Sequence, residues 1–280
     1  MIEVMMLVIM ICCLIILGFI IKHIRTIIIK LMIKSRMKSE QYFLNYQPIY
    51  NPKTMEIVGF EALLRLKGKN KEIILPSRFL SQIEKNNMLL DISIWIIKKA
   101  IKDYQEIRDF RCVLGKDFYI SLNVSLKELE NDFFIKRATK ILTESNLKRG
   151  AICLEIVERV KINDVDKITK NIACLKKAGF KIAIDDFGVE YSNLDILHKL
   201  DFDTIKVDKH FIDGIDKDFI KEEIILFISR IVKYKNKSVV LEGIEEVNQD
   251  LRIKEMKHPS LYVQGYYYNK PMSIEDLKNM

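Results

Sequence analysis

Acidic, basic and amide side chains recur where short apolar runs of this sequence end, at positions that a purely structural core would leave apolar. Burying an unpaired ion costs several kcal/mol, so such positions need a chemical reason. Any one of them alone is best explained as part of a surface salt bridge, whereas the whole set at strand ends indicates one site. The set is Glu61, Asn123, Glu155, Glu158, Asp185, Asp186, Lys206, Glu242 and Gln264.

These residue types suit hard divalent cations. Carboxylates gathered in one place repel one another and raise one another's pKa unless a cation neutralises them. Oxygen ligands with an amide, and without His or Cys, favour Mg²⁺ or Mn²⁺ over zinc. We therefore expect Mg²⁺ or Mn²⁺ as the cofactor.

Asp185 and Asp186 are adjacent in the run KIAIDDF at 181–187. Neighbours on a regular strand face opposite sides, so both reach one site only where the strand is ending. A carboxylate pair able to bridge two cations suggests two-metal hydrolysis, in which both ions hold the oxygens of an in-line phosphoryl displacement. Lys206 supplies positive charge for the phosphate or the attacking water, and Arg65 offers a bidentate fork for a phosphate oxygen. We therefore expect a phosphodiester substrate.

The elements that must position these residues follow from the pattern beyond about Glu40, where short apolar runs alternate with longer amphipathic stretches. This alternation is typical of βα units. We expect strands at 118–125, 152–157, 181–187, 203–208, 238–243 and near 262–266, and helices near 77–87, 91–110, 131–145, 162–179, 217–235 and 245–256. With a preceding hairpin, about eight strands and their helices predict one α/β domain of residues 40–280, a (β/α) barrel. The carboxyl ends of barrel strands meet at one face, where the polar set would converge.

The hairpin decides whether Glu61 lies on a strand or on an amphipathic helix. The runs FLNYQPIY at 43–50 and EIVGFEALLRL at 56–66 flank NPKT. A Pro-containing turn of this kind joins antiparallel strands. We therefore predict that Glu61 lies on the second strand of the hairpin.

Residues 1–39 form a separate segment. Val4–Ile21 carries no charge and is long enough to cross a bilayer as a helix. A buried soluble helix would rarely lack a polar stripe, and a cleaved signal peptide would need a basic start and a small-residue cleavage site. The six basic residues of 22–38 then place this side in the cytoplasm. This basic segment continues either as an amphipathic helix against anionic lipid or as a dimerisation helix.

The overall composition is that of a folded protein, with 49% hydrophobic residues among 280. The net charge is +8, and residues 1–40 supply half of it, with six basic and two acidic residues. The remainder is not basic enough to indicate a nucleic-acid surface, so we expect no DNA or RNA partner. The five cysteines contain no CxxC pair, which favours a reducing compartment.

The ordered motifs of residues 42–280 resemble those of the EAL domain family of cyclic di-GMP phosphodiesterases, named after the tripeptide found here as Glu61-Ala62-Leu63. The motifs are YQPIY, VGFEALLRL, SLNVS, LEIVE, IDDFG, DTIKVD, LEGIE and VQGYYYNKP. One such tripeptide means little, but eight motifs in family order and spacing are highly specific. The resemblance implies a modified TIM barrel with an antiparallel first strand, two Mg²⁺ or Mn²⁺ ions per active site and hydrolysis of cyclic di-GMP to linear pGpG.

The resemblance also implies a role for each matching residue. The metal ligands, direct or through water, would be Glu61, Asn123, Glu155, Asp185, Asp186 and Glu242. Catalysis would use Glu61 and Glu242, with Lys206 and Gln264 positioning the attacking water. The nucleotide would contact Gln47, Leu63, Arg65 and Asp208. Glu158 would brace the loop after Asp186 without touching the metal.

One loop departs from the family pattern. The family reads DDFG-x-G-[YF]-S-S-L, whereas this chain reads DDFGVEYSNL, with Glu190 in place of Gly and Asn193 in place of Ser. If the glycine is needed for positive φ, Glu190 costs on the order of 1 kcal/mol or more. In the family this loop couples metal binding to dimerisation, so the rate, the metal affinity and the dimer contact depend on it.

The sequence leaves three functions open. The first is a phosphodiesterase that is anchored by one span in the inner (cytoplasmic) membrane, has its catalytic domain in the cytoplasm and forms a homodimer through the barrel. The second is a catalytically weak or inactive receptor that binds cyclic di-GMP and signals through its anchor, and the third is a scaffold that binds only other proteins. Degenerate receptors usually lose metal ligands, and this chain retains them all, which favours the enzyme.

Overall fold

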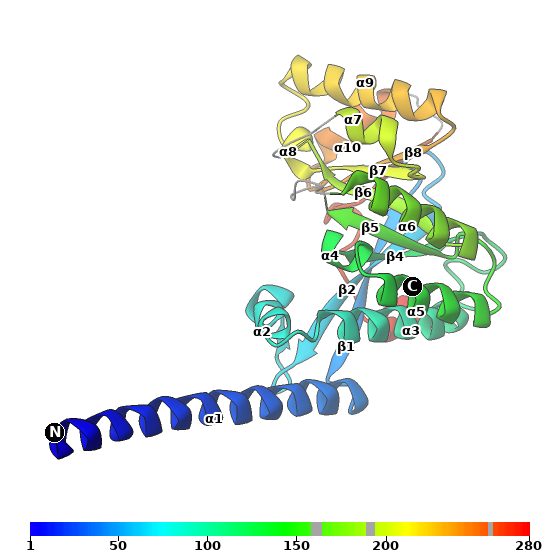
Figure 1. Ribbon diagram of the computed structural model, residues 1–280. Helices are drawn as coiled ribbons and strands as arrows, with labels where there is room; N and C mark the ends of the chain where they lie inside the picture. The colour runs from blue at the N-terminus through cyan, green and yellow to red at the C-terminus, as the bar shows by residue number, and fades with distance from the viewer. Residues whose placement is uncertain (158–163, 189–193, 257–259) are drawn as a thin grey trace. The chain divides into compact units, whose positions relative to one another are not determined.

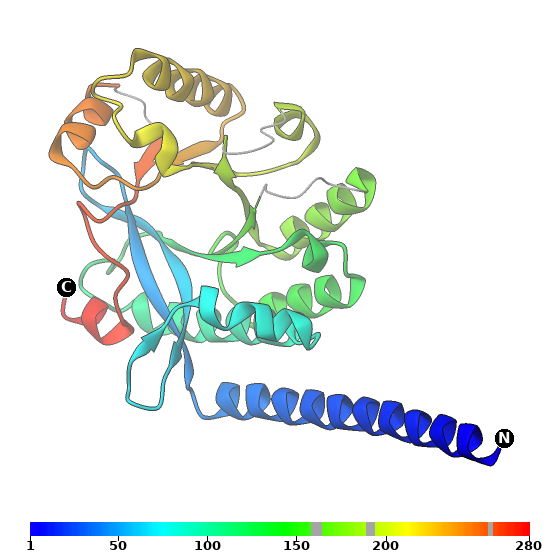
Figure 2. The same ribbon diagram turned by 90° about the vertical axis from the view of Figure 1, so that its left-hand side faces the viewer.

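A computed structural model describes residues 1–157, 164–188, 194–256 and 260–280. The chain divides into two compact units. The first is formed by Met1–Phe43 and Arg65–Ile92, and the second by Leu44–Leu64 and Ser93–Met280. Figure 1 labels the elements and Figure 2 gives a second view. Whether 40–280 is an independent domain stays a prediction.

The first unit begins with helix α1, Ile2–Lys38, which is uninterrupted over 37 residues. The basic segment therefore does continue the apolar segment as one helix. Large apolar side chains along the first half are exposed, among them Leu14 at 60% and Phe19 at 69%. By length and composition α1 is able to cross a membrane.

The rest of the first unit includes a short strand that was not predicted and two short elements where one helix was predicted. Strand β3, Ile73–Ile74, pairs antiparallel with the end of β2, Ile57–Lys67. A 3₁₀ turn η1 at Pro76–Arg78 then leads into helix α2, Leu80–Lys85. The predicted helix near 77–87 is thus divided at Phe79. This residue is buried and packs on Tyr42, with 5.5 Å between the two ring centroids.

Eight strands form a closed barrel. The seven strands that follow one another around it in parallel are β2, β4 (Tyr119–Val124), β5 (Ile152–Val157), β6 (Lys181–Phe187), β7 (Thr204–Val207), β8 (Ser238–Leu241) and β9 (Leu261–Val263). Strand β1, Tyr42–Tyr50, pairs antiparallel with β9 and also pairs with β2, which closes the ring. The α/β barrel with an antiparallel first strand is therefore confirmed.

Strands β1 and β2 form the predicted hairpin. At its turn the Asn51 N–H donates to the carbonyl oxygen of Glu56 at 2.9 Å. The Asn51 side-chain oxygen accepts from the N–H of Lys53 at 3.0 Å, which is how Asn stabilises a turn. Glu61 lies on a strand, as predicted.

The longer helices that connect the strands correspond to the predicted ones. They are α3 (Leu89–Ile107), α5 (Asp132–Glu144), α6 (Val165–Ala178), α9 (Phe219–Tyr234) and α10 (Val247–Glu255). Four short helices were not predicted, because four to six residues are too few to show a helical period. These are α4 (Leu126–Leu129), α7 (Leu194–Lys199), α8 (Lys209–Ile212) and α11 (Ile274–Lys278).

A layer of buried side chains crosses the barrel interior, and we call it the apolar layer. Its members come from five different strands and are Ile49, Tyr119, Cys153, Ala183 and Val240. Gly59 makes room for the Tyr119 ring, because a Cβ there would lie 2.8 Å from it. Two residues further along a strand the side chain returns to the same face. The apolar layer is therefore followed by Glu155 on β5, by Asp185 on β6 and by Glu242 directly after β8.

Candidate active site

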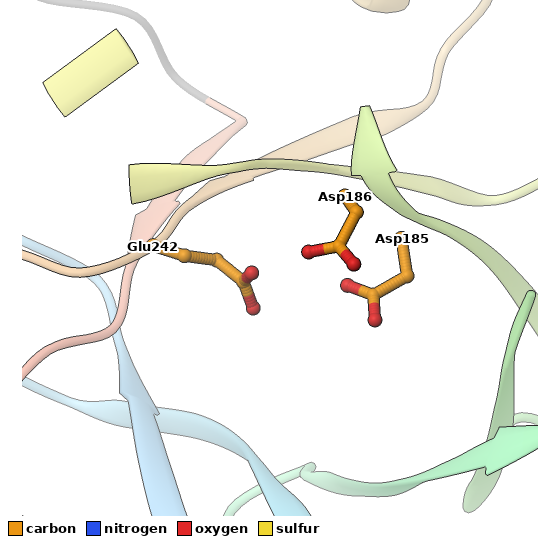
Figure 3. A group of neighbouring side chains, drawn as sticks. All are labelled: Asp185, Asp186 and Glu242. Carbon is orange, nitrogen blue, oxygen red and sulfur yellow. The ribbon is translucent and has the colours of Figure 1, made fainter. Parts of the chain in front are cut away.

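The predicted polar residues meet at the carboxyl ends of the barrel strands. Asn123 on β4 and Glu155 on β5 are Cα partners on neighbouring strands. One carboxylate oxygen from each of Asp185, Asp186 and Glu242 lies within 4.8 Å of the other two, and Figure 3 shows the three side chains pointing into one space. Closure of the barrel thus brings together residues from distant parts of the sequence.

Asp185 and Asp186 reach the same space although they are neighbours on β6. The pairing of β6 with β7 shifts register between Ile184 and Phe187, and Asp186 has a φ of 52°. Asp tolerates this left-handed backbone better than most residues, and the bulge turns its side chain toward that of Asp185. We expected the two side chains to reach one site because the strand ends there. Instead, β6 continues to Phe187, and a bulge within the strand aligns Asp185 with Asp186.

Lys206 lies at the centre of the carboxylates. Its Nζ is 2.7 Å from Glu242 Oε1 and 2.9 Å from Glu155 Oε2. It is also 3.1 Å from Asp185 Oδ1 and 3.5 Å from Glu61 Oε2. The lysine side chain is 2% exposed, so its charge acts in a region of low dielectric constant.

Glu61 is held by two amide groups. Gln264 Nε2 donates to Glu61 Oε2 at 2.7 Å, and Asn123 Nδ2 donates to Glu61 Oε1 at 3.2 Å. The side-chain amide nitrogens of Asn123 and Gln264 both face Glu61. Their amide oxygens are therefore left to bind a cation or a water molecule. Strand β2, which carries Glu61, is therefore linked by side chains to its neighbour β4 and to the residue that follows β9.

Burial and mutual repulsion change the affinity of the cluster for protons. The pKa of Glu155 is raised to about 8 by burial and by Glu61 and Asp185, against the opposing effect of Lys206. Burial likewise raises the pKa of Glu242 well above its ordinary value. Burial by itself lowers the pKa of Lys206, but the surrounding carboxylates outweigh it and raise that pKa well above its ordinary value. The ammonium therefore stays charged, and a divalent cation would have to displace protons from the acids.

A cleft of about 210 Å³ opens over the cluster. The predicted residues that line it are Gln47, Glu61, Asp208, Glu242 and Gln264. Asp208 also caps helix α8, because its Oδ1 accepts from the N–H of His210 at 2.8 Å. The cleft thus combines an acidic floor with amide groups that suit a phosphodiester held by metal ions.

Two further predicted residues, Leu63 and Arg65, follow Glu61 along β2. Leu63 is half-buried on β2 and shares the face of Glu61 by strand alternation. Arg65, two residues further along, belongs to the first compact unit, and its contact with a nucleotide stays a prediction. Glu158 and Glu190 both lie outside the described residues.

The sequence did not indicate the residues at the rim of the cleft, namely Lys209, Glu245 and Tyr266. Lys209 Nζ lies 2.6 Å from Glu245 Oε1. Gly243 permits this approach, since a Cβ at this residue would lie 2.4 Å from the Cβ of Lys209. The glycine directly after Glu242 was the available signal, because an invading side chain is a common reason for glycine at a strand end.

Comparison with curated proteins finds relatives among phosphodiesterases. The chain is 34% identical over 240 residues to the probable cyclic di-GMP phosphodiesterase PdeI of Escherichia coli K12, covering 86% of this chain and 30% of that protein. It is 28% identical over 244 residues to the probable cyclic di-GMP phosphodiesterase PdeN of the same organism, covering 87% and 46%. The chain therefore spans less than half the length of either relative.

Solved structures share the barrel. An EAL domain protein from Listeria monocytogenes EGD-e superposes with a TM-score of 0.77 at 30% identity, over 88% of this chain and 95% of that one. The PaMucR phosphodiesterase in complex with c-di-GMP gives a TM-score of 0.78 at 26% identity, over 89% and 99%. Residues 31–271 match the family described as EAL domain. A match of this extent, on a barrel of the same fold, shows that the chain belongs to the EAL domain family.

Proposed function

We propose that the chain is a cyclic di-GMP-specific phosphodiesterase that hydrolyses cyclic di-GMP to linear pGpG. The observation that carries this proposal is an excess of negative charge in one buried cluster. Four carboxylates, those of Glu61, Glu155, Asp185 and Glu242, lie within 3.5 Å of the Lys206 ammonium, and a fifth, that of Asp186, lies beside Asp185 and Glu242. The names of PdeI and PdeN and the c-di-GMP complex of PaMucR support the choice of substrate.

Charge balance supports two divalent cations per active site. When ionised, five carboxylates and one ammonium leave four negative charges, which two divalent ions would neutralise. The donor set fits Mg²⁺ or Mn²⁺, because Asp185, Asp186 and Glu242 offer only oxygen atoms to one space. Glu61, Asn123 and Glu155 would complete the two ligand sets. When bound, such ions polarise the phosphate and lower the pKa of a water molecule.

The side chains around the cluster would bind and orient the reactants. Lys206 keeps a fixed positive charge beside the phosphate and, with Gln264, orients the attacking water. Glu61 and Glu242 belong to the acidic cluster and also line the cleft, so they would lie between the bound substrate and the metal ions. The nucleotide contacts would come from Gln47, Leu63, Arg65 and Asp208, two of which line the cleft.

Product analysis tests this proposal directly. The 280-residue chain, purified in detergent, is incubated with cyclic di-GMP and Mn²⁺, and the nucleotides are separated by chromatography. Linear pGpG is expected, and EDTA is expected to prevent its formation. Binding of cyclic di-GMP without any product would instead support the receptor, for which the replacement of Gly by Glu190 is the motivating departure.

Helix α1 supports anchoring in the inner (cytoplasmic) membrane. Its 37 residues extend about 55 Å at 1.5 Å per residue, more than the hydrocarbon core of about 30 Å. The apolar part would span the bilayer, and the basic part would follow on the cytoplasmic side with the catalytic domain. Membrane association that resists high salt is expected, since burial of apolar side chains is not screened. Extraction by salt alone would contradict the anchor.

The exposed face of α9 supports a homodimer through the barrel. The helix packs on β7 and β8 with one face, but its other face exposes Ile220 at 68%, Phe227 at 46% and Tyr234 at 92%. The spacing of seven residues forms a stripe able to pack on a second copy. Glu223 and Arg230 flank Phe227, so antiparallel packing would set each Glu223 opposite an Arg230 of the partner copy.

Charge reversal tests this interface. Glu223→Arg or Arg230→Glu alone is expected to weaken the dimer, and the double variant is expected to restore it. Light scattering of the detergent-solubilised chain over a concentration series measures the association. A wild-type monomer throughout the series would contradict the proposal, as would a double variant weaker than both single variants.

A further inference from the structure

The hydrogen bonds around Gln264 determine which way its side-chain amide points. Its Nε2 donates to Glu61 Oε2 at 2.7 Å and to Gln47 Oε1 at 3.2 Å. Both N–H groups are thereby used. The amide oxygen is buried and has no hydrogen-bond partner among the residues that the structure describes. A buried acceptor beside Glu61 is therefore available to a water molecule.

Gln47 is oriented in turn by the polypeptide backbone. Its Nε2 donates to the carbonyl oxygen of Asn269 at 3.1 Å, which turns Oε1 toward Gln264. The chain of amides thus ends on two groups that act as acceptors, the Glu61 carboxylate and the Asn269 carbonyl. Rotating either amide by half a turn would set acceptor against acceptor, so the arrangement permits one orientation of Gln264.

The Asn269 carbonyl is fixed by the side chain of the same residue. Asn269 Oδ1 accepts from the Tyr50 hydroxyl at 2.5 Å. The Asn269 N–H donates to the carbonyl oxygen of Gly265 at 3.1 Å, which closes the turn after Gln264. Tyr50 is 5% exposed, and its ring stacks on Tyr268 with 5.3 Å between centroids. A rigid aromatic group thus holds the end of the chain.

We propose that Tyr50 and Asn269 are positioning residues, which act through Gln47 to hold Gln264 Oε1 where it accepts a hydrogen bond from the attacking water. This inference rests on the proposed hydrolysis of cyclic di-GMP. In that reaction the water oxygen bonds to phosphorus, the bond from phosphorus to a ribose oxygen breaks, and one water proton ends on that ribose oxygen. An acceptor fixed on one O–H of the water aligns the oxygen lone pair with the phosphorus.

Kinetics of Tyr50→Phe and Asn269→Ala test the inference in the 280-residue chain. Each is expected to lower kcat about tenfold, the usual cost of losing an outer support of a metal site. The Mn²⁺ dissociation constant is expected to stay within about twofold, since neither Tyr50 nor Asn269 nor the Gln47 between them is proposed to touch the metal. The double variant should be no worse than either single variant, because both changes release the same carbonyl.

Two further variants separate positioning from a general loss of structure. Asn269→Asp keeps an acceptor for the Tyr50 hydroxyl and is expected to restore most of kcat. Tyr268→Phe removes the neighbouring hydrogen bond to Asp250 and serves as the matched control, with kcat unchanged. An equal loss of kcat in Tyr268→Phe, or additive losses in the double variant, would overturn the inference.

A measurement without turnover keeps the inference distinct from the proposed function. The chain labelled with ¹⁵N-glutamine gives side-chain amide signals, and that of Gln264 is identified by its loss in Gln264→Leu. Slow exchange of these amide protons with solvent is expected in the wild type and faster exchange in Tyr50→Phe. Unchanged exchange would overturn the inference even if the wild type hydrolyses cyclic di-GMP. Changed exchange in a chain without turnover would support the positioning while contradicting the proposed function.

Discussion

The barrel interior contains two adjacent layers of opposite chemistry that are built by the same strands. The apolar layer includes Cys153, Ala183 and Val240, all at most 1% exposed. Glu155 and Asp185 stand two residues further along β5 and β6, and Glu242 directly follows the end of β8. Together with Glu61 on β2 we call them the acidic layer. Both layers face the same interior, so strand periodicity alone does not distinguish them.

The difference shows where this fold gains stability and where it gives stability up. Side chains of the apolar layer bury carbon atoms and stabilise the barrel by transfer from water and by close packing. The acidic layer concentrates like charges in a buried space, which destabilises the folded state unless a cation is present. Such a trade is typical of functional sites. Changes in the acidic layer should therefore affect turnover first, and changes in the apolar layer should affect folding first.

The largest expected effect is on turnover in the acidic layer. Glu61→Ala and Asp185→Asn should each lower kcat by about 10³-fold or more, because each removes negative charge from the proposed metal sites. Chromatography of pGpG with Mn²⁺ measures the loss, and cyclic di-GMP binding is expected to survive in part. Glu144→Gln, at an exposed residue of α5, is the control with normal turnover. Near-normal turnover by both site variants would defeat the two-metal assignment.

The next largest effect is expected on stability when the Lys206 ammonium is removed. Lys206→Met leaves the carboxylates without their described counter-charge, so in EDTA the free energy of unfolding should fall by about 3 kcal/mol. Mn²⁺ should stabilise this variant more than the wild type, because it then supplies all of the positive charge. Guanidinium unfolding with and without Mn²⁺ measures both. Lys140→Met, at an exposed residue of α5, should change neither value. Equal stability of Lys206→Met and wild type would contradict the role of the cluster.

In the apolar layer we expect a smaller effect, and we expect it on stability and not on turnover. Val240→Ala opens a cavity in the barrel and should lower the free energy of unfolding by about 2 kcal/mol. Turnover well below the melting temperature should stay within about twofold, since the strand end with Glu242 is unchanged. Val247→Ala, at an exposed residue of α10, is the control for the lost methyl groups. A loss of kcat as large as that of Asp185→Asn would show that the two layers do not act separately.

The last effect, which is the smallest when it is taken per pH unit, concerns stability in the absence of metal. Glu155 has a pKa of about 8 in the folded chain against an ordinary 4.5. Between these two pH values Glu155 holds a proton in the folded state and releases it in the unfolded state. Its contribution to the free energy of unfolding is therefore complete below pH 4.5 and is lost as the pH rises through 8. In EDTA the free energy of unfolding should fall over this window by at most about 1.4 kcal/mol per pH unit, the limit for one proton. Glu155→Gln should remove this component, and parallel slopes for variant and wild type would refute it.

Much of the fold was predictable because its signals are local. Alternating apolar runs and amphipathic stretches indicate strands and helices wherever an element is long enough to show its period. The turn NPKT located the hairpin, and the uncharged run of residues 4–21 located α1. The same criterion misses α7 and α8, which occupy six and four residues.

By itself the sequence determined the donor types of the candidate site and the strand ends that carry them, because both follow from residue identity and local pattern. Only the tertiary structure decided that Lys206 lies among four carboxylates, that a bulge aligns Asp185 with Asp186, and that Gln47 and Asn269 orient Gln264. These contacts join residues up to 222 positions apart. Their distances depend on how the closed sheet twists and staggers its strands, which no local pattern records.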